Sequence, residues 1–331
     1  MLSLGGTIAS TKADVVSGGV TPQLTANDLI SAVPKLLDVA DVAAVEFRSV
    51  PSGDLTFTDI VALAKVIDRC FEEGTDGVVI TQGTDTIEET SFALELLVRG
   101  SRPLIVTGAM RNPTMVSPDG PANLLASVLV AASPDAAGLG TLVVLNDEIH
   151  ASRFVRKSHT SSLATFHSPS CGPLGWIIEG RVRVVLRVPP LATLDRSPVG
   201  DVPAIALIKI SLGEDARVIE QIASLGYAGA VVEGFGGGHV PAAMVPGLET
   251  LASRMPVVLA SRTGSGELLQ RTYGFAGSEQ DLLARGVLSA GPLDGLKARV
   301  LLSLTMSIDD EYVRAREVFE RVVTSVTSSN H

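Results

Sequence analysis

Nearly continuous hydrophobic runs recur along the first half of the chain, at residues 77–81, 103–108 and 141–146. Such runs are typical of strands in a parallel sheet that is covered on both faces. Between them, apolar residues recur with helical spacing, as in the segment 60–71, where they share one helix face. This alternation predicts an α/β fold with a mostly parallel, doubly wound sheet.

A second series of hydrophobic runs follows a proline-rich interruption. Residues 189–202 contain several prolines and show no periodicity, which indicates a linker. The runs after it are residues 203–210, 228–234 and 255–260. We therefore expect a catalytic α/β domain at residues 1–188 and a second, smaller α/β domain at residues 203–331.

Composition and charge narrow the class of ligand. The chain has 331 residues, of which 46% are hydrophobic, and this suits one large core or two moderate ones. Its formal net charge of −10 and its lack of a basic block argue against a nucleic-acid partner or an anionic membrane surface. We therefore expect a small-molecule substrate.

The two cysteines and the hydrophobic windows bear on location. Cys70 and Cys171 lie far apart and outside any CxxC pattern, which favours buried thiols over a disulfide. The start of the sequence lacks the basic region and the long apolar run of a signal peptide. The longest apolar window, residues 124–132, is too short to span a membrane. These features predict a soluble protein in a reducing compartment, the cytoplasm.

Several polar residues follow the predicted strands. Ligands of open α/β sheets bind at the carboxyl ends of the strands, so these positions are candidate site residues. Thr7 follows two glycines after the first short apolar run, whereas Thr84 and Asp85 follow the run at residues 77–81. Lys157 lies in the polar segment after a later run.

These residue types suit nucleophilic acyl transfer. A threonine hydroxyl needs a base that accepts its proton, and the developing oxyanion needs donors already directed at it. The glycines before Thr7 would let backbone amides approach a substrate closely. Burial lowers the pKa of a lysine and a neighbouring carboxylate raises it. The sequence therefore leaves open whether Lys157 is a neutral base, and whether Asp85 binds a substrate ammonium group instead.

Each of these residues alone also has a structural explanation. A Gly-Gly-Thr sequence is common in tight turns, and Thr84 and Asp85 suit a turn before a helix. Thr86 and Glu89 fit the T-x-x-E capping box that would begin this helix. Lys157 suits a solvated basic surface. The catalytic interpretation is favoured because the segments would meet at one edge of a parallel sheet.

Other enzyme classes lack their sequence patterns. The histidines show no HExxH or paired metal-ligand spacing. The chain has no GxSxG elbow, which argues against an α/β-hydrolase serine enzyme. It has no Gly-Lys dipeptide, which excludes a Walker-type phosphate loop. The sequence GFGGGH at residues 234–239 is too loose for the dinucleotide fingerprint of an NAD-binding domain. We expect neither a metal nor a cofactor.

Two segments resemble signature motifs of a known family. GGTIAS at residues 5–10 and TQGTDTIEET at residues 81–90 are similar to the two motifs of the bacterial-type L-asparaginase and glutaminase-asparaginase family. Further matches occur in family order across nearly the whole chain: TGAMR (107–111), SPDGPANL (117–124), LNDEIHASRFVRK (145–157) and LKARVLL (296–302).

The resemblance implies an amidohydrolase that converts L-asparagine and water to L-aspartate and ammonia without a cofactor. Thr7 matches the nucleophile that forms an acyl-enzyme, and residues 9–22 match a mobile lid, with Gly18 and Gly19 as its hinge. Thr84, Asp85 and Lys157 match the second catalytic triad of the family, in which the lysine assists the threonine and the aspartate holds the substrate α-ammonium group.

The resemblance also implies substrate-binding residues and an oligomer. Ser52 matches the serine that holds the α-carboxylate, and Ala109 matches a small residue of the amide pocket. Glu279 matches a glutamate that a neighbouring subunit donates, which implies a homodimer or a homotetramer of two such dimers. Gly53 and Gly237 stand where many members have a glutamine and an asparagine, so two polar contacts to the substrate are absent.

Two alternatives to an asparaginase remain open. One is a glutaminase-asparaginase of broad specificity. The other is a catalytically weak amino-acid-binding or ammonia-supplying subunit, because the lid lacks the tyrosine that usually bonds the nucleophile. The tyrosines of this chain, Tyr227, Tyr273 and Tyr312, all lie in the second predicted domain. Retention of Thr7, Thr84, Asp85 and Lys157 argues against a pure binding protein, which does not need a lysine beside a threonine.

Overall fold

The computed structural model describes residues 1–12, 20–22, 24–194, 198, 201–308 and 312–327. The chain divides into two compact units, Met1–Pro190 and Leu191–His331. The first predicted domain, residues 1–188, ends two residues before this division. The linker at residues 189–202 remains a prediction, because several of its residues lie outside the described part.

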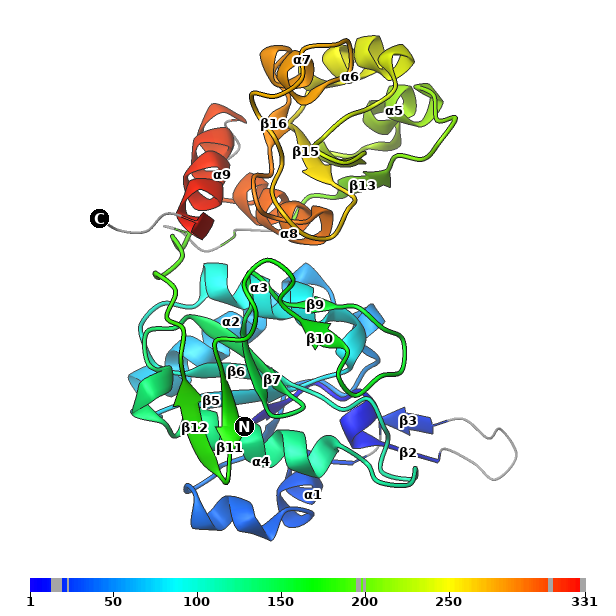
Figure 1. Ribbon diagram of the computed structural model, residues 1–331. Coiled ribbons are helices and arrows are strands. Elements are labelled where there is room, and N and C mark those ends of the chain that lie inside the picture. The colour runs from blue at the N-terminus through cyan, green and yellow to red at the C-terminus, as the bar shows by residue number, and fades with distance from the viewer. Residues whose placement is uncertain (13–19, 23, 195–197, 199–200, 309–311, 328–331) are drawn as a thin grey trace. The chain divides into compact units, whose positions relative to one another are not determined.

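The first unit is built on a mixed sheet whose parallel part lies at one side (Figure 1). Eight described strands lie in the order β12-β11-β8-β7-β6-β5-β1-β4. The parallel strands are β1 (Leu2–Ser3), β4 (Val45–Glu46), β5 (Val78–Thr81), β6 (Leu104–Thr107) and β7 (Thr141–Leu145). The antiparallel strands are β8 (Glu148–Ala151), β11 (Gly175–Ile178) and β12 (Arg181–Val184). The predicted runs therefore form central parallel strands, which confirms the α/β fold class.

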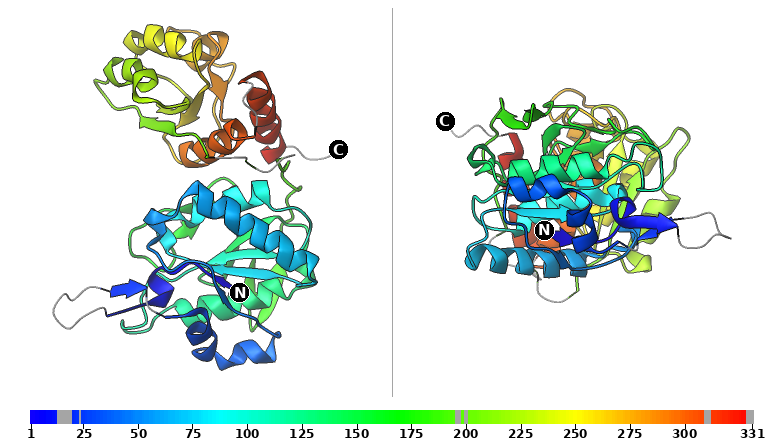
Figure 2. Two further views of the ribbon diagram at one scale, coloured as in Figure 1. Left: turned by 180° about the vertical axis from the view of Figure 1, so that it is seen from behind. Right: turned by 90° about the horizontal axis from the view of Figure 1, so that it is seen from below.

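Helices cover both faces of this sheet (Figures 1 and 2). α2 (Phe57–Glu72) and α3 (Ile87–Leu97) lie on one face, and α1 (Ala26–Ser31) and α4 (Gly120–Ala131) lie on the other. Side chains of α4 pack with Val79 and other sheet residues in one hydrophobic core. Burial of apolar side chains on both faces explains why the central strands have almost no polar residues.

The start of α3 differs from the sequence prediction. Thr86 and Glu89 fit a capping box, but the Thr86 side chain makes no cap hydrogen bond, so this prediction is wrong. The Thr86 hydroxyl donates instead to the Ser52 carbonyl oxygen at 3.1 Å. The Thr86 oxygen accepts from the Gln82 Nε2 atom at 3.3 Å, so a side-chain donor stands where the local backbone N–H was expected. By contrast, Thr56 and Asp59 form a complete capping box at the start of α2.

Short elements connect the main strands and helices of the first unit. They are η1 (Thr7–Ala9), η2 (Pro34–Asp38), η3 (Ser52–Asp54), η4 (Thr84–Thr86), η5 (Pro134–Ala136), and the paired strands β2 (Ser10–Lys12) with β3 (Val20–Pro22) and β9 (Arg156–Lys157) with β10 (Phe166–His167). Most of the predicted site residues lie in these short elements: Thr7, Ser52, Thr84, Asp85 and Lys157.

The second unit contains a smaller parallel sheet, as the resumed hydrophobic runs predict. Its strands lie in the order β13 (Ile205–Lys209), β14 (Gly229–Gly234), β15 (Val257–Ser261) and β16 (Leu288–Ser289). The helical elements are α5 (Arg217–Gln221), η6 (Ile222–Leu225), η7 (Ala242–Met244), α6 (Val245–Ala252), α7 (Glu279–Ala284), α8 (Gly295–Met306) and α9 (Tyr312–Thr327). Ile210, Val232 and Leu259 belong to its hydrophobic core.

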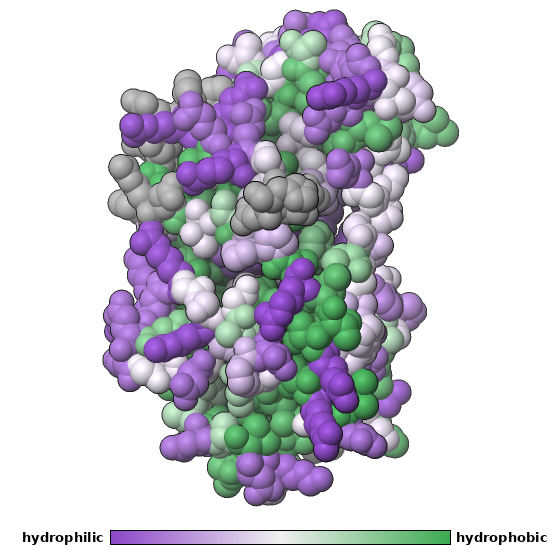
Figure 3. All heavy atoms as spheres, turned by 60° about the vertical axis from the view of Figure 1, so that its left-hand side comes forward, coloured by the Kyte–Doolittle hydropathy of each residue, from purple (hydrophilic) through white to green (hydrophobic). Residues whose placement is uncertain are grey.

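The surface and the thiols complete the description. On the face drawn in Figure 3, patches of hydrophobic residues alternate with hydrophilic ones. Cys70 and Cys171 are free thiols that are half-buried rather than buried as expected. Among the described helices, none is both long and apolar enough to cross a membrane.

Candidate active site

The turns after β1 and β5 lie side by side because the two strands are parallel neighbours. Leu2 pairs with Ile80, and the Leu4 N–H donates to the Thr81 carbonyl oxygen at 2.8 Å. The turn that ends in Thr7 therefore starts at the same sheet edge as the turn that ends in Thr84. Both hydroxyl residues stand at the carboxyl ends of adjacent strands.

These two turns are in close contact at Gly6 and Gly83. Gly6 has a φ angle of +85°, and a Cβ atom on it would lie 2.0 Å from the backbone nitrogen of Gly83. No other residue fits there, because both the conformation and the space require the absence of a side chain. Gly6 is thus needed for the close approach of the segment carrying half-buried Thr7 to the segment carrying Thr84.

Ser52 joins the same cluster from η3. A Cβ atom on Gly83 would lie 2.7 Å from the Ser52 hydroxyl oxygen, so the serine packs directly on the turn before Thr84. Ser52 is buried, and its backbone carbonyl holds Thr86. The adjacent Gly53 is different, since a Cβ atom there would have no neighbour within 4 Å. Open space therefore surrounds this position.

Lys157 connects the β9 hairpin to the turn after β5. Its Nζ atom donates to the Thr84 Oγ1 atom at 2.8 Å and to the Asp85 Oδ1 atom at 2.6 Å. The Lys157 side chain is 15% exposed, whereas the Asp85 side chain is 79% exposed. The lysine is thus held between a buried hydroxyl and a carboxylate that solvent or a ligand can reach.

The turn after β6 forms another wall of the cluster. Ala109 is fully buried, and a Cβ atom on Gly108 would lie 3.2 Å from the Thr84 methyl carbon. The Asp119 carboxylate accepts hydrogen bonds from two backbone N–H groups of this turn, at 3.0 and 2.8 Å. Asn123 donates to the Gly108 carbonyl and accepts from the Asn146 N–H, both at 3.0 Å.

Asp119 and Asn123 help to build the site but were not among the predicted site residues. Both lie in the segment SPDGPANL, which contributed to the sequence prediction only through the family resemblance. Short polar side chains after a predicted strand are the signal that points to them, because such residues satisfy the backbone of a tight loop.

Parts of the predicted site lie elsewhere. Residues 13–19, including the hinge glycines Gly18 and Gly19, fall outside the described residues, so the lid remains a prediction. Glu279 begins α7 in the second unit and has no exposed surface. Its Oε1 atom accepts the N–H groups of Thr272 and Tyr273, at 2.8 and 2.7 Å.

The Glu279 carboxylate is held as an anion. Burial alone would raise its pKa, but hydrogen bonds from the backbone of Tyr273, Thr272 and Glu279 itself, together with the charge of His239, outweigh burial and lower the pKa. His239 Nε2 lies 3.3 Å from its second oxygen. The rings of Tyr273 and Phe275 pack edge-on against His239, with centroids 4.9 and 5.2 Å away.

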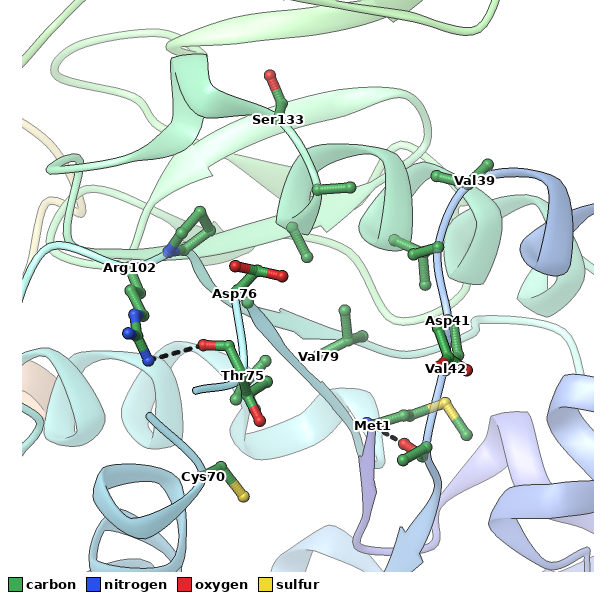
Figure 4. Close-up of a pocket in the computed structure, with 18 of the residues that line it drawn as sticks. Met1, Val39, Asp41, Val42, Cys70, Thr75, Asp76, Val79, Arg102 and Ser133 are labelled. Atoms are coloured by element: carbon green, nitrogen blue, oxygen red, sulfur yellow. Dashed lines mark hydrogen bonds between the residues drawn. The ribbon is translucent and has the colours of Figure 1, made fainter. Parts of the chain in front are cut away.

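A cavity of about 800 Å³ occurs in the first unit but does not contain these groups (Figure 4). It is lined by the starts of β1 and β5 and by polar side chains that include Asp76 and Arg102. This is the amino-terminal edge of the parallel strands, opposite to the edge at which Thr7 and Thr84 lie. The candidate site is therefore defined by convergent side chains and not by this cavity. Among the described residues, no group of three His, Cys, Asp or Glu side chains could hold a metal ion.

Two α/β units and a cluster of hydroxyl, amine and carboxylate groups at a strand edge are the features with which known proteins can be compared. The asparaginase N-terminal family model matches residues 1–189, and the glutaminase/asparaginase C-terminal domain model matches residues 204–319. The chain belongs to the asparaginase family, which confirms the resemblance seen in the sequence.

Individual relatives agree with this assignment. The chain is 35% identical to a Haemophilus influenzae protein described as a probable periplasmic L-asparaginase, over 97% of this chain and 91% of that protein. The crystal structure of a probable cytoplasmic L-asparaginase from Campylobacter jejuni has a TM-score of 0.86 and 32% identity, covering 97% of this chain and 98% of that one. The L-asparaginase 2 of Escherichia coli is 34% identical, over 97% of this chain and 92% of that protein.

Proposed function

We propose that the protein is an L-asparaginase that hydrolyses the side-chain amide of L-asparagine to L-aspartate and ammonia. The observation that carries this proposal is the contact between Lys157 Nζ and Thr84 Oγ1 at 2.8 Å, in a chain of the asparaginase family. A lysine beside a buried hydroxyl suits proton transfer and has no purpose in simple amino-acid binding.

Thr7 is the nucleophile in this proposal. Its hydroxyl oxygen attacks the amide carbon, the hydroxyl proton is transferred to the amide nitrogen, and the C–N bond breaks to release ammonia. Water then attacks the resulting ester and releases aspartate, which regenerates the hydroxyl. Backbone N–H groups of the glycine turn are the candidate donors for the oxyanion, since Gly6 has no side chain to keep a substrate away.

Thr84, Lys157 and Asp85 form the second part of the machinery. As a neutral amine, Lys157 would accept the proton of the Thr84 hydroxyl. The ion pair with Asp85 opposes this, because an ammonium group has no lone pair to accept a proton. The exposed Asp85 carboxylate suits the α-ammonium group of the substrate, and this exchange of partners would free Lys157 for proton transfer.

The remaining predicted residues serve the other end of the substrate. The Ser52 hydroxyl would bind the α-carboxylate, and the small Ala109 would leave room for the amide. Gly53 has no side chain to contact the substrate, and the space around it suits a water-mediated contact.

We further propose that the site is completed in a homodimer or homotetramer, with Glu279 contributed across a subunit interface. The exposed aromatic residues Tyr273 and Phe275, at 44% and 51% exposure, support an interface near this carboxylate. Glu279 has no exposed surface in the single chain, so its use by a neighbouring subunit requires its cover to move. We place the enzyme in the cytoplasm because both thiols are free.

Ammonia release from the purified protein tests the function. Asparagine and glutamine are supplied separately, and the variants Thr7→Ala and Lys157→Met are compared with the wild type. We expect release from asparagine that is faster than from glutamine and that both substitutions reduce strongly. Comparable rates on the two amides would favour a broad glutaminase-asparaginase. Asparagine binding by calorimetry without ammonia release would favour the binding or ammonia-supplying subunit.

A further inference from the structure

The hairpin that carries Lys157 is closed by a dense set of hydrogen bonds on one buried threonine. The carbonyl oxygen of Thr165 accepts the backbone N–H and the hydroxyl of Ser158, at 2.8 and 2.9 Å. The Thr165 hydroxyl accepts the His159 N–H at 2.9 Å and donates to the His159 carbonyl oxygen at 2.5 Å. Thr165 has no exposed surface, so its hydroxyl is fully used within the hairpin.

The ring of His159 closes the tip of the same hairpin. Its Nδ1 atom accepts the backbone N–H groups of Ser161 and Ser162, each at 3.0 Å. This arrangement resembles the turns that asparagine side chains make with the backbone two residues on. The His159 side chain is exposed and is not part of a hydrophobic core cluster of the described residues. Its specific contribution is therefore the hydrogen bonding of the turn.

These bonds matter because the strand that carries Lys157 is very short. β9 and β10 have two residues each, and Lys157 pairs with buried Phe166. Ser158, the next residue along the chain, is held by the contacts of the loop. A base must lie about 2.6–3.2 Å from the proton donor, and a displacement of about 1 Å can cost a hundredfold in rate.

We propose that Thr165 and His159 are positioning residues, which fix the hairpin so that Lys157 Nζ lies within proton-transfer distance of the Thr84 hydroxyl. The inference rests on the proposed function, in which Lys157 is the base. It assigns to an exposed histidine, which touches neither Thr84 nor Asp85, a role in the chemical step.

The kinetic test compares two matched pairs of variants. His159→Ala removes the acceptor of the turn, whereas His159→Asn keeps a side-chain oxygen that accepts the same N–H groups and has a good propensity for such turns. Thr165→Val removes the hydroxyl at similar volume, and Thr165→Ser keeps it. We expect about a tenfold loss of kcat in His159→Ala and Thr165→Val, with KM within about twofold of the wild type, and near-normal kcat in the conservative variants.

The choice of substituted residue separates an effect on folding from an effect on catalysis. The decisive variant is His159→Ala, since His159 is exposed and its replacement leaves the core intact, whereas Thr165 is buried. Circular dichroism and thermal unfolding of each variant separate a loss of folded protein from a loss of kcat. A purely stabilising role would lower the unfolding temperature of His159→Ala and leave kcat per folded molecule unchanged, which would overturn the inference.

A second measurement reports the position of Lys157 without activity. Trinitrobenzenesulfonate modifies free amines, and mass spectrometry of the peptide that contains residue 157 gives the rate at this site, with Lys157→Met as the blank. We expect faster modification in His159→Ala than in the wild type and His159→Asn. If Lys157→Met keeps full activity, the proposed base has failed, and the modification rate alone then decides whether the turn fixes the lysine. An unchanged rate in His159→Ala overturns the inference in either case.

Discussion

The ion pairs that Lys157 and Lys297 form with carboxylates differ in their access to solvent. Lys157 Nζ lies 2.6 Å from Asp85, with side chains that are 15% and 79% exposed. Lys297 Nζ lies 2.9 Å from Asp294, with side chains that are only 1% and 10% exposed. The first pair can exchange its partner for a ligand, whereas the second is enclosed.

The local structure of each pair explains this difference. Asp294 caps α8 by accepting the Lys297 N–H at 3.0 Å, so the second pair lies within one helix turn and stabilises the helix start. Lys157 and Asp85 come from separate elements, a hairpin strand and the turn before α3. An enclosed pair is expensive to break, because the remaining charge loses its oppositely charged partner where water has little access. A solvent-accessible pair contributes little to the free energy of unfolding, but its carboxylate stays accessible to a ligand.

Removal of the open lysine should give the largest effect on activity. Lys157→Met takes away the proposed base and keeps a chain of similar length. We expect kcat to fall by roughly 10²–10⁴-fold, the usual contribution of general acid–base catalysis, with little change in the free energy of unfolding. Ammonia release and urea unfolding measure the two quantities on the same sample. Activity within threefold of the wild type would contradict the proposed role.

Removal of the enclosed lysine should give the opposite pattern. Lys297→Met leaves the Asp294 carboxylate buried without this partner, and we expect a loss of about 3–5 kcal/mol in the free energy of unfolding of the second unit. Activity per folded molecule should change little if Glu279 is the one side chain of this unit that takes part in the active site. Unfolding followed by circular dichroism in urea checks the stability. A loss below about 1 kcal/mol would show that the two pairs are energetically alike.

The position of the turn that carries Asp85 depends on the close contact between Gly6 and Gly83. Gly6→Ala places a methyl group at a φ angle of +85° and within 2.0 Å of the Gly83 nitrogen. Strain and overlap together should cost about 3 kcal/mol or more in the free energy of unfolding and should separate the Thr7 turn from the Thr84 turn. Gly53→Ala is the matched control, since nothing lies within 4 Å of its Cβ position. Equal unfolding curves for the two variants would refute this account.

The fold follows from features that the sequence displays directly. The central strands β5, β6 and β7 are predictable because a strand buried on both faces has no polar alternation to obscure it. One face of α2 is equally clear, with Ile60 and Leu63 buried. The capping box at Thr86 does not form because its oxygen accepts from Gln82 Nε2 and its proton is donated to the Ser52 carbonyl oxygen. Ser52 is 34 residues away, and no local sequence pattern indicates so distant a partner.

The site was only partly predictable for the same reason. Parallel strand order alone brings Thr7 and Thr84 to one edge, so the sequence indicates their neighbourhood. The contact between Thr84 and Lys157 joins residues 73 positions apart through a hairpin whose loop is fixed by Thr165. Hydrogen bonds of this kind depend on the folded geometry, and neither composition nor periodicity encodes them.

The proposed binding of the substrate α-ammonium group by Asp85 can be tested with a substrate that lacks this group. Succinamic acid is asparagine without its α-amino group, so it cannot replace Lys157 at the Asp85 carboxylate. A charge-assisted hydrogen bond contributes about 1.5–3 kcal/mol, and we expect kcat/KM for ammonia release to fall by about 10–100-fold relative to asparagine. In Asp85→Asn the two substrates should differ much less. Equal kcat/KM values for both amides in the wild type would show that Asp85 does not recognise the ammonium group.

The smallest expected effect is the pH dependence of the free energy of unfolding. His150 in the first unit and Glu279 in the second contribute to it in different pH ranges. Burial holds the pKa of His150 below its ordinary value of 6.5, although Glu148 partly opposes this. The unfolded chain therefore binds more protons than the folded chain just below pH 6.5. The contribution of His150 is complete above that pH and is lost as the pH falls below it.

Glu279 acts in a lower range with the same sign. Its pKa in the folded chain lies below the ordinary value of 4.5, because burial, which would raise it, is outweighed by backbone hydrogen bonds and His239. Its contribution is complete above pH 4.5 and is lost as the pH falls through the folded-state pKa. Between pH 6.5 and pH 5.5 the free energy of unfolding should therefore fall through His150. His150→Gln should reduce this drop, whereas Glu279→Gln should leave it unchanged and alter only the transition below pH 4.5. A drop that persists in His150→Gln would assign the titration to another group.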